Sequence, residues 1–343
     1  MFLEKEIAEQ PEVLTRLVHE QNENARTIAA AIRDFDPVFI HIAARGTSDN
    51  AARYAQYLIG SHFGKVVSLA TPSLHTIYHC QPDLSRALVI GVSQSGQAED
   101  VRQVLEDAQS QGALTLAITN YPDSPMAQTA SYHLALMAGE EVSIAATKTY
   151  TSQLASFALL TAHLADKPEM LAQLHKIAVY AQETLDLSRQ ILNWAERYRY
   201  MEQFVTIGRG LNYCTAFEIS LKVKELCYIN GDGYSEADFR HGPIALIQRG
   251  FPVIVVAPQD QPFNYMLDLI DKLAEKEAEV LVISNREEAF ARATKSMPIA
   301  DVPPWLSPII SIIPGQIFAM QQALVRNYAI DKPRGLNKVT VTQ

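Results

Sequence analysis

Short apolar runs alternate along the whole chain with longer segments in which apolar residues recur every three to four positions. The short runs predict buried strands, and the longer segments predict amphipathic helices, such as one over 100–108 with an apolar stripe at Val101, Val104, Leu105 and Ala108. This alternation is typical of parallel α/β domains, so we expect doubly wound, flavodoxin-like sheets flanked by helices. The predicted strands are 38–43, 66–70, 87–92, 114–119, 132–136, 204–208, 253–257 and 280–284.

The pattern repeats once within the chain. "FIHIAARG" at 39–46 resembles "FVTIGRG" at 204–210, and "LTLAITN" at 114–120 resembles "EVLVISN" at 279–285. Gly46 precedes Asn120 by 74 residues, and Gly210 precedes Asn285 by 75. Such internal similarity predicts a duplicated domain.

The duplication suggests a division of the 343 residues, which are too many for one ordinary domain. The expected parts are a helical segment packed outside the first copy (1–35), the first copy (36–167), a helical linker (168–200), the second copy (201–330) and a tail carrying Lys338 (331–343).

Composition and charge narrow the class of protein. Apolar residues make up 48% of the chain, which indicates a globular protein, and the formal charge of −9 argues against nucleic acid or an anionic membrane as a partner. The start "MFLEKEIAEQ" lacks the apolar core of a signal peptide, and no run is expected to span a membrane. We therefore expect a cytoplasmic protein.

Cysteine and histidine give little sign of a metal. Cys80, Cys214 and Cys227 form no CxxC pair and are expected to be reduced core thiols. His75 and His79 have a helical i,i+4 spacing that could bind zinc, but no further ligand stands beside them, so we expect neither metal nor cofactor.

The loop "SQSGQAED" at 93–100 follows a buried strand and precedes a helix, where free backbone N–H groups suit an anion. Ser95 could instead serve as a helix N-cap. The register of the repeat places Ala257-Pro258-Gln259-Asp260 at the matching position of the second copy, and the aspartate there would repel an anion. This difference favours phosphate binding by the first copy alone.

A second turn of this kind is "RGTSDN" at 45–50, where Ser48 is a candidate phosphate ligand or a helix cap. Ligands in doubly wound sheets lie beyond the carboxyl ends of the strands, so both turns could face one crevice. The turn "GRGLNY" at 208–213 lacks the third glycine of a dinucleotide-binding fingerprint, which argues against the binding of a nicotinamide cofactor.

Three further positions in the second half carry chemistry. A helix is predicted over 218–229, with Lys222 and Glu225 three residues apart, a spacing at which most pairs are solvated surface pairs. His241 stands at a turn in "FRHGP", where a functional histidine or one satisfied by its own loop would fit. Lys338 lies in the tail "DKPRGLNKVTVTQ" and would ordinarily be solvated.

Five motifs in order give the chain a resemblance to tandem sugar-isomerase (SIS) domain proteins. The pattern is closest to the isomerase half of glucosamine-6-phosphate synthase and to the related deaminases without a glutaminase half. The motifs are "ARGTSDN", "SQSGQAEDV", "EEVSIAATKTYTSQL", "LKVKELCYI…FRHGPIALI" and "KPRGLNKVTV".

The resemblance implies a role for each matching residue. Glu225 would match the base that moves a proton between C1 and C2, and Lys222 a helper in proton transfer. His241 would match a ring-opening histidine supplied by the neighbouring subunit of a homodimer, and Lys338 the lysine that meets the open-chain carbonyl. The implied substrate-binding positions are Gly46, Thr47, Ser48, Ser93, Gln94, Ser95, Ala98, Ile144 and Ala146.

Two of these positions depart from the synthases, because Ala98 replaces a threonine and Ala146 a serine. The chain also begins Met1-Phe2-Leu3, without the nucleophilic cysteine of a glutaminase. The expected activity is conversion of glucosamine 6-phosphate to fructose 6-phosphate and ammonia. The alternatives are a fructosamine-6-phosphate deglycase and a sugar-phosphate sensor without catalysis.

Overall fold

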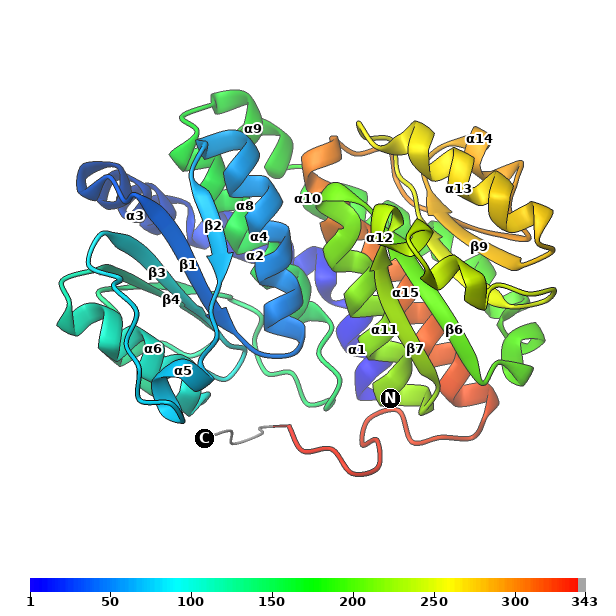
Figure 1. The fold of residues 1–343 in the computed structure, drawn as a ribbon, viewed down its shortest axis with the longest axis horizontal. Helices are drawn as coiled ribbons and strands as arrows, with labels where there is room; N and C mark the ends of the chain where they lie inside the picture. Colours follow the sequence, from blue (N-terminus) through cyan, green and yellow to red (C-terminus); the bar gives the residue numbers. More distant parts are fainter. Residues whose placement is uncertain (339–343) are drawn as a thin grey trace. The chain divides into compact units, whose positions relative to one another are not determined.

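The computed structural model describes residues 1–338 and contains two five-stranded parallel sheets (Figure 1). The chain divides into two compact units. The first-sheet unit comprises 12–141, 148–177 and the described tail residues Asn337 and Lys338, and the second-sheet unit comprises 1–11, 142–147 and 178–336. The α/β prediction is therefore confirmed, although each unit draws on more than one stretch of chain.

The first sheet has the strand order β2-β1-β3-β4-β5. Helices α4 and α8, with α3 on α8, lie on one face, while α6 with α5 and α7 lies on the other (Figure 1). The strands are β1 (Phe39–Ala44), β2 (Val66–Leu69), β3 (Ala87–Val92), β4 (Leu114–Thr119) and β5 (Tyr132–Ala135). The helices are α2 (Gln10–Glu20), α3 (Asn22–Phe35), α4 (Thr47–Phe63), α5 (Ser73–Thr76), α6 (Glu99–Ser110), α7 (Pro125–Thr129), α8 (Lys148–Leu164) and α9 (Pro168–Leu174).

The second sheet has the order β10-β9-β8-β6-β7, which is the first order repeated. Its strands are β6 (Gln203–Gly208), β7 (Asn230–Ser235), β8 (Pro252–Val256), β9 (Glu279–Ser284) and β10 (Lys295–Pro298). Its helices are α1 (Phe2–Ala8), α10 (Ile177–Ser188), α11 (Tyr213–Cys227), α12 (Glu236–Arg240), α13 (Phe263–Glu275), α14 (Glu287–Phe290) and α15 (Ser307–Val325), with short 3₁₀ turns η1 (Arg189–Asn193), η2 (Ala195–Tyr200), η3 (Gly210–Asn212), η4 (Pro243–Leu246) and η5 (Pro304–Leu306).

The predicted duplication is confirmed by this shared order. Gly46 and Gly210, which each lie two residues after the matching strands β1 and β6, adopt positive φ values of 56° and 60°. The predicted stripe on α6 is buried, and the strands over 87–92 and 114–119 begin and end where the sequence places them. The amphipathic pattern therefore fixes these elements well.

The N-terminal helices depart from the prediction. Residues 2–35 are almost entirely helical, but Met1–Pro11 belongs to the second-sheet unit rather than packing outside the first copy. The Leu3 N–H donates to Asp331 Oδ1 at 2.9 Å, and Gln10 Nε2 donates to Gln316 Oε1 at 3.0 Å. Leu3 lies in α1 and Gln10 begins α2, so both bonds tie the first residues of the chain to distant parts of the second-sheet unit.

One helix is long and apolar enough to cross a membrane by length and composition, which the sequence analysis did not expect. It covers Pro304–Val325, with a hydropathy of 1.3, and 83% of its apolar 18-residue window is buried inside the protein. Helix α15 packs against α11 of the same unit. It is a core helix, because its apolar surface is covered by protein.

Three smaller expectations meet different outcomes. Cys214 and Cys227 are buried, but Cys80 is exposed, so it is not a core thiol. Helix α5 ends at Thr76 and His79 has a φ of 50°, so His75 and His79 do not share a helix face. His75 instead hydrogen-bonds Asp107 through Nδ1 at 2.7 Å.

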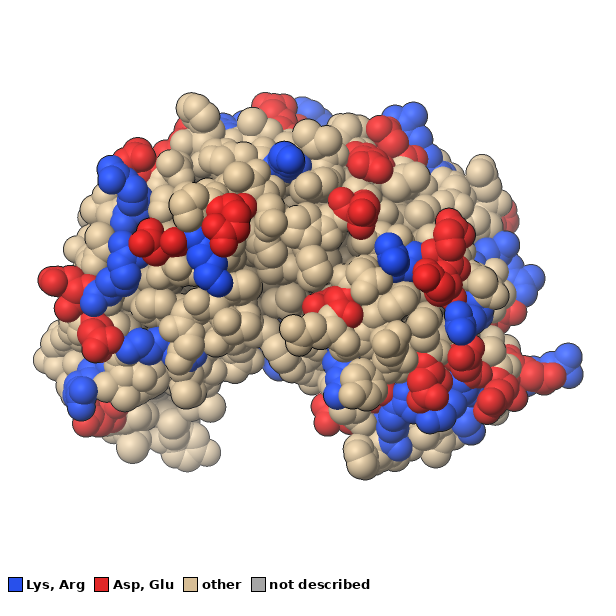
Figure 2. Space-filling view, turned by 90° about the horizontal axis from the view of Figure 1, so that it is seen from above, with Lys and Arg blue, Asp and Glu red and all other residues tan. Residues whose placement is uncertain are grey.

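Charged side chains of both signs are intermixed on the face shown in Figure 2. No broad region of Lys and Arg is seen on that face. Together with the net charge of −9, this distribution gives the displayed surface no basic patch of the kind that binds nucleic acid.

Candidate functional site

The loops after β1 and β3 lie at the position where ligands bind in sheets of this order. The strand order reverses between β1 and β3, which are adjacent and parallel, so their carboxyl ends form the topological switch point. Arg45, in the first loop, pairs through Nε at 2.6 Å with the buried Asp100, in the first turn of the helix α6 that follows the second loop. The two predicted anion-binding turns are therefore tied to each other within one unit.

The loop after β3 carries its hydroxyls in a folded turn. Ser93 Oγ accepts the Gly96 N–H at 3.1 Å, and Ser95 Oγ accepts the Gln97 N–H at 3.3 Å. Helix α6 begins only at Glu99 with Ala98 as its N-cap, so the N-cap interpretation of Ser95 is wrong. Each hydroxyl accepts one bond and retains its hydrogen for donation.

Gly96 is the residue that this turn requires. Its φ of 68° is in the left-handed region, and an added Cβ would lie 2.2 Å from Ser124 Oγ. Among residues 1–338, no hydrogen-bond partner is found for the backbone N–H groups of Gln94 and Ser95. The turn thus combines a close backbone approach, free donors and the N-terminal end of a helix, which suits a phosphate.

The corresponding loop of the second sheet has the opposite character. The Gln259 N–H donates to the side chain of Asn285 at 2.8 Å, whereas the matching Asn120 bonds Gly139 and Ala138 instead. One small pocket beside this loop has a volume of about 10 Å³, barely the size of one water, and both Asp260 and Arg209 line it. Burial raises the pKa of Asp260, and the remaining negative charge opposes an anion.

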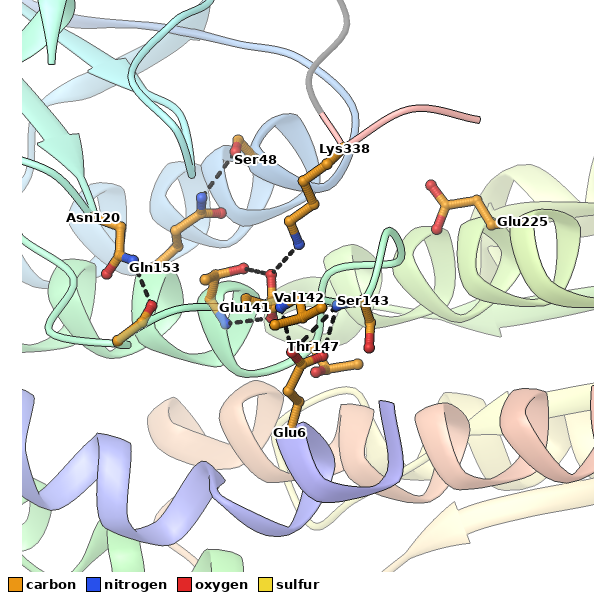
Figure 3. Close-up of polar contacts among 12 residues, drawn as sticks. Glu6, Ser48, Asn120, Glu141, Val142, Ser143, Thr147, Gln153, Glu225 and Lys338 are labelled. Carbon is orange, nitrogen blue, oxygen red and sulfur yellow. Dashed lines mark hydrogen bonds and ion pairs between the residues drawn. The ribbon is translucent and has the colours of Figure 1, made fainter. Parts of the chain in front are cut away.

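Ser48 lies one residue inside α4, which has Gly46 as its N-cap and no side-chain cap. The alternative of Ser48 as a helix cap is therefore wrong. Its Oγ instead accepts a hydrogen bond from Gln153 Nε2 on α8 at 2.8 Å (Figure 3). Thr47 is the first residue of the same helix.

Lys338 is held by a buried carboxylate rather than solvated. Its Nζ lies 3.0 Å from Glu141 Oε2, and the Glu141 side chain is fully buried (Figure 3). The same carboxylate accepts the Thr149 hydroxyl at 2.7 Å and the Thr149 N–H at 3.2 Å. The remaining residues of the terminal motif, 339 to 341, lie outside the described residues.

The segment 142–147 belongs to the second-sheet unit. The buried Glu6 of α1 accepts the N–H groups of Val142 and Ser143 at 2.5 and 3.2 Å (Figure 3). The Ile144 N–H donates to the Asp331 carbonyl at 3.2 Å. Ile144 and Ala146 are both partly exposed.

Helix α11 holds the predicted acid–base pair. Lys222 Nζ lies 2.6 Å from Glu225 Oε2 and 3.4 Å from Glu218 Oε1. The side chain of Lys222 is 1% exposed, that of Glu218 is fully buried and that of Glu225 is 23% exposed. A solvated surface pair is therefore the wrong interpretation: one ammonium is enclosed by two carboxylates, of which Glu225 reaches solvent.

Close packing of α15 on α11 explains this burial. A Cβ on Gly315 of α15 would lie 2.4 Å from Ile219 Cγ1, so only glycine permits the observed approach. Helix α11 starts at Tyr213 and ends at Cys227, earlier at both ends than predicted, with Tyr228 in the left-handed conformation.

His241 follows α12 and is exposed on its own chain. Gly242, the next residue, has a φ of 136°. An exposed imidazole that ends a short helix is free to meet another molecule.

The sequence analysis missed four residues that form ion pairs or hydrogen bonds with side chains of the predicted site or its loops. They are Glu218, which contacts Lys222, Asp100, which anchors Arg45, Glu141, which pairs with Lys338, and Gln153, which bonds Ser48. Glu218 alone left a clear signal, since it precedes Lys222 by four residues on one helix.

Comparisons with known proteins agree with this architecture. The chain is 31% identical over 345 residues to the glutamine–fructose-6-phosphate aminotransferase (isomerizing) of Aquifex aeolicus, covering 99% of this chain and 57% of that protein. It resembles the crystal structure of a candidate phosphosugar isomerase from Silicibacter pomeroyi, with 29% identity, a TM-score of 0.85, and coverage of 96% of this chain and 99% of that one.

The glucosamine-6-phosphate deaminase of Thermotoga maritima shares the fold at 22% identity, with a TM-score of 0.82 and full coverage of both chains. The SIS domain family model matches residues 21–163 and 200–326. The chain therefore belongs to the SIS domain family and contains two SIS domains.

Proposed function

We propose that this chain is a phosphosugar isomerase and deaminase that converts glucosamine 6-phosphate and water to fructose 6-phosphate and ammonia. The observation that carries the proposal is the asymmetry between the two sheets. Only the first has glycine- and serine-bearing turns at its switch point, while the second has the closed space beside Asp260. The names of the relatives, which concern phosphosugar isomerisation and amino transfer, support the substrate class.

The ester phosphate is assigned to the first-sheet turns. Ser48, Ser93 and Ser95 would donate hydroxyl hydrogens, and Gln94 its backbone N–H. Gly46, Thr47, Ala98, Ile144 and Ala146 would line the bound sugar. Ala98 and Ala146 have only a methyl side chain and cannot form hydrogen bonds through it. The sugar hydroxyls beside these two alanines would therefore be bound by water or left in solvent.

The proton transfer is assigned to Glu225. In the open-chain aldehyde, the Glu225 carboxylate would take the proton from C2 and return it to C1, which turns the C2 amine into an imine. Water would hydrolyse that imine to the ketone and ammonia, so the atoms balance. Lys222, hydrogen-bonded to Glu225, would assist by giving the C1 oxygen the proton that it gains as the carbonyl becomes a hydroxyl.

Lys338 and His241 complete the proposal. Lys338 would meet the open-chain carbonyl, with Glu141 fixing its ammonium. His241 would open the sugar ring of a neighbouring subunit, which calls for a homodimer. We expect this enzyme to act in the cytoplasm without a cofactor.

Two other functions have specific grounds. The alanines at 98 and 146 remove hydroxyls beside the sugar, which would suit a fructosamine 6-phosphate whose amino acid leaves in place of ammonia. A sensor would bind the sugar phosphate through the same turns and leave it unchanged. The buried arrangement around Lys222 favours catalysis over sensing, because enclosing such charges is costly for binding alone.

The test incubates the purified chain with glucosamine 6-phosphate and measures free ammonia and fructose 6-phosphate. Equal release of both products supports the proposal. Turnover of fructosamine 6-phosphates alone indicates the deglycase, and tight binding without turnover of either substrate indicates the sensor.

A further inference from the structure

We infer that Gln153 on α8 is a positioning residue that turns the hydroxyl of Ser48 toward the bound phosphate. The inference rests on the proposed function, since it requires Ser48 to donate to the ester. Its starting point is the hydrogen bond between these two side chains, which lie 105 residues apart in sequence.

The direction of this hydrogen bond decides where the Ser48 hydrogen points. An amide nitrogen can only donate, so at 2.8 Å the Ser48 oxygen accepts from Gln153 Nε2. The hydroxyl hydrogen must then point away from the amide. Within residues 1–338 no acceptor is found for it, and it stands in the first turn of α4, where an anion is favoured.

Burial makes the arrangement rigid. Gln153 is 1% exposed and Ser48 is 7% exposed. Every residue of α8 is buried, and α8 packs along α4. The amide therefore has no space to swing away, and the Ser48 hydroxyl has one preferred orientation before any ligand arrives, which is how pre-organised donors strengthen binding.

The amide oxygen of Gln153 indicates that fold stability alone does not account for a glutamine at this position. Its Oε1 is buried and has no hydrogen-bond partner among the described residues. An unsatisfied buried carbonyl oxygen lowers stability, so an apolar side chain of the same length would suit the core better. The hydrogen bond that Gln153 Nε2 donates to Ser48 is therefore the interaction for which the amide is needed.

A neighbouring contact extends the same logic. Thr149, one turn before Gln153 on α8, bonds Glu141, which holds Lys338. Residues four apart share a helix face. One face of α8 therefore supports the Ser48 hydroxyl directly and the Lys338 ammonium through Glu141. Figure 3 marks the contacts of Gln153 with Ser48 and of Glu141 with Lys338.

The experiment measures binding of fructose 6-phosphate, and of inorganic phosphate as a simpler probe, by isothermal titration of the full chain. The variants are Gln153→Met, Ser48→Ala and their combination. Ser156→Ala is the matched control, because Ser156 is also a buried α8 residue with an unpartnered oxygen. Urea unfolding of each variant reports stability separately.

We expect Gln153→Met to weaken both ligands about 3- to 10-fold, the effect of one lost hydrogen bond, without lowering the urea midpoint. In the Ser48→Ala background the same substitution should have no further effect. Ser156→Ala should leave both affinities unchanged. If Gln153→Met does not fold, Gln153→Leu replaces it in the same cycle.

Unchanged affinity in Gln153→Met, or an equal loss with and without Ser48, would overturn the inference while leaving the proposed function intact. Failure of the unaltered chain to bind fructose 6-phosphate would overturn the proposed function, and the inference with it.

Discussion

Lys222 Nζ lies 2.6 Å from Glu225 Oε2 and 3.4 Å from Glu218 Oε1, so a single ammonium joins two carboxylates inside the second-sheet unit. The exposed edge of this cluster is Glu225. The arrangement keeps a carboxylate at the surface while its proton-carrying neighbour stays fixed behind it. Glu225 and Lys222 can be tested separately, because a change at the partly exposed Glu225 affects catalysis, whereas a change at the buried Lys222 affects both catalysis and stability.

Replacing Glu225 by glutamine should remove proton transfer with little change in shape. We expect Glu225→Gln to lower kcat about 10²- to 10⁴-fold, the usual effect of losing a general base. Affinity for fructose 6-phosphate by titration should stay within about threefold, because the phosphate contacts remain. The control is Glu275→Gln, an exposed carboxylate on α13 of the same unit. A variant with full kcat would show that Glu225 is not the base.

Removing Lys222 should cost stability as well as activity. Lys222→Met removes the ammonium between the fully buried Glu218 and the partly exposed Glu225, and removing one partner of a buried ion pair costs about 3–5 kcal/mol. Urea unfolding should show this loss. The matched control is Lys224→Met on the same helix, since Lys224 is 43% exposed and lies 3.8 Å from Asp232. That variant should change the unfolding free energy by less than about 1 kcal/mol. Equal losses in both variants would contradict the role of burial.

Gly96→Ala should damage the phosphate turn for two reasons. The residue has a φ of 68°, and its new Cβ would lie 2.2 Å from Ser124 Oγ. Gly112→Ala is the control, because Gly112 has a φ of 83° but open space around it, so it isolates the conformational cost of about 1–2 kcal/mol. We expect Gly96→Ala to lose more stability than this control and to weaken binding of fructose 6-phosphate, which Gly112→Ala should leave intact. Similar values for both would mean that Ser124 moves aside freely.

Asp260 predicts a pH dependence. Desolvation by burial raises its pKa, while a backbone hydrogen bond from Gln261 lowers it by a smaller amount. Folding therefore favours the protonated acid: its stabilising contribution is full below the unfolded pKa and is lost as pH rises through the raised folded pKa. Asp260→Asn, which keeps an oxygen for Gln261, should raise the unfolding midpoint at pH 7, with the gain shrinking toward pH 3. A gain that does not depend on pH would contradict this account.

The fold and the positions of the candidate residues could be read from the sequence because they depend on local patterns. The strand over 87–92 is an uninterrupted apolar run, and the glycine and two serines of the turn that follows it are adjacent in the sequence, at 93–96. The repeat then fixed which loops correspond between the two sheets.

Partners brought together by folding could not be read in this way. The spacing of Lys222 and Glu225 is the same for a solvated pair and a buried one, and only the approach of α15 at Gly315 makes it buried. Likewise Gln153 reaches Ser48, and Glu141 reaches Lys338, across more than 100 residues of sequence. The alternative of Ser95 as an N-cap failed because α6 starts at Glu99, three residues later than that alternative required.

The central claim is that only the first of the two related sheets holds the phosphate. A crystal structure of the chain soaked with fructose 6-phosphate tests it most directly. The account predicts phosphate density within hydrogen-bond distance of the Ser93 and Ser95 hydroxyls, with the loop over 257–260 empty. Phosphate bound at that second loop, in contact with Gln259 or Asp260, would contradict it.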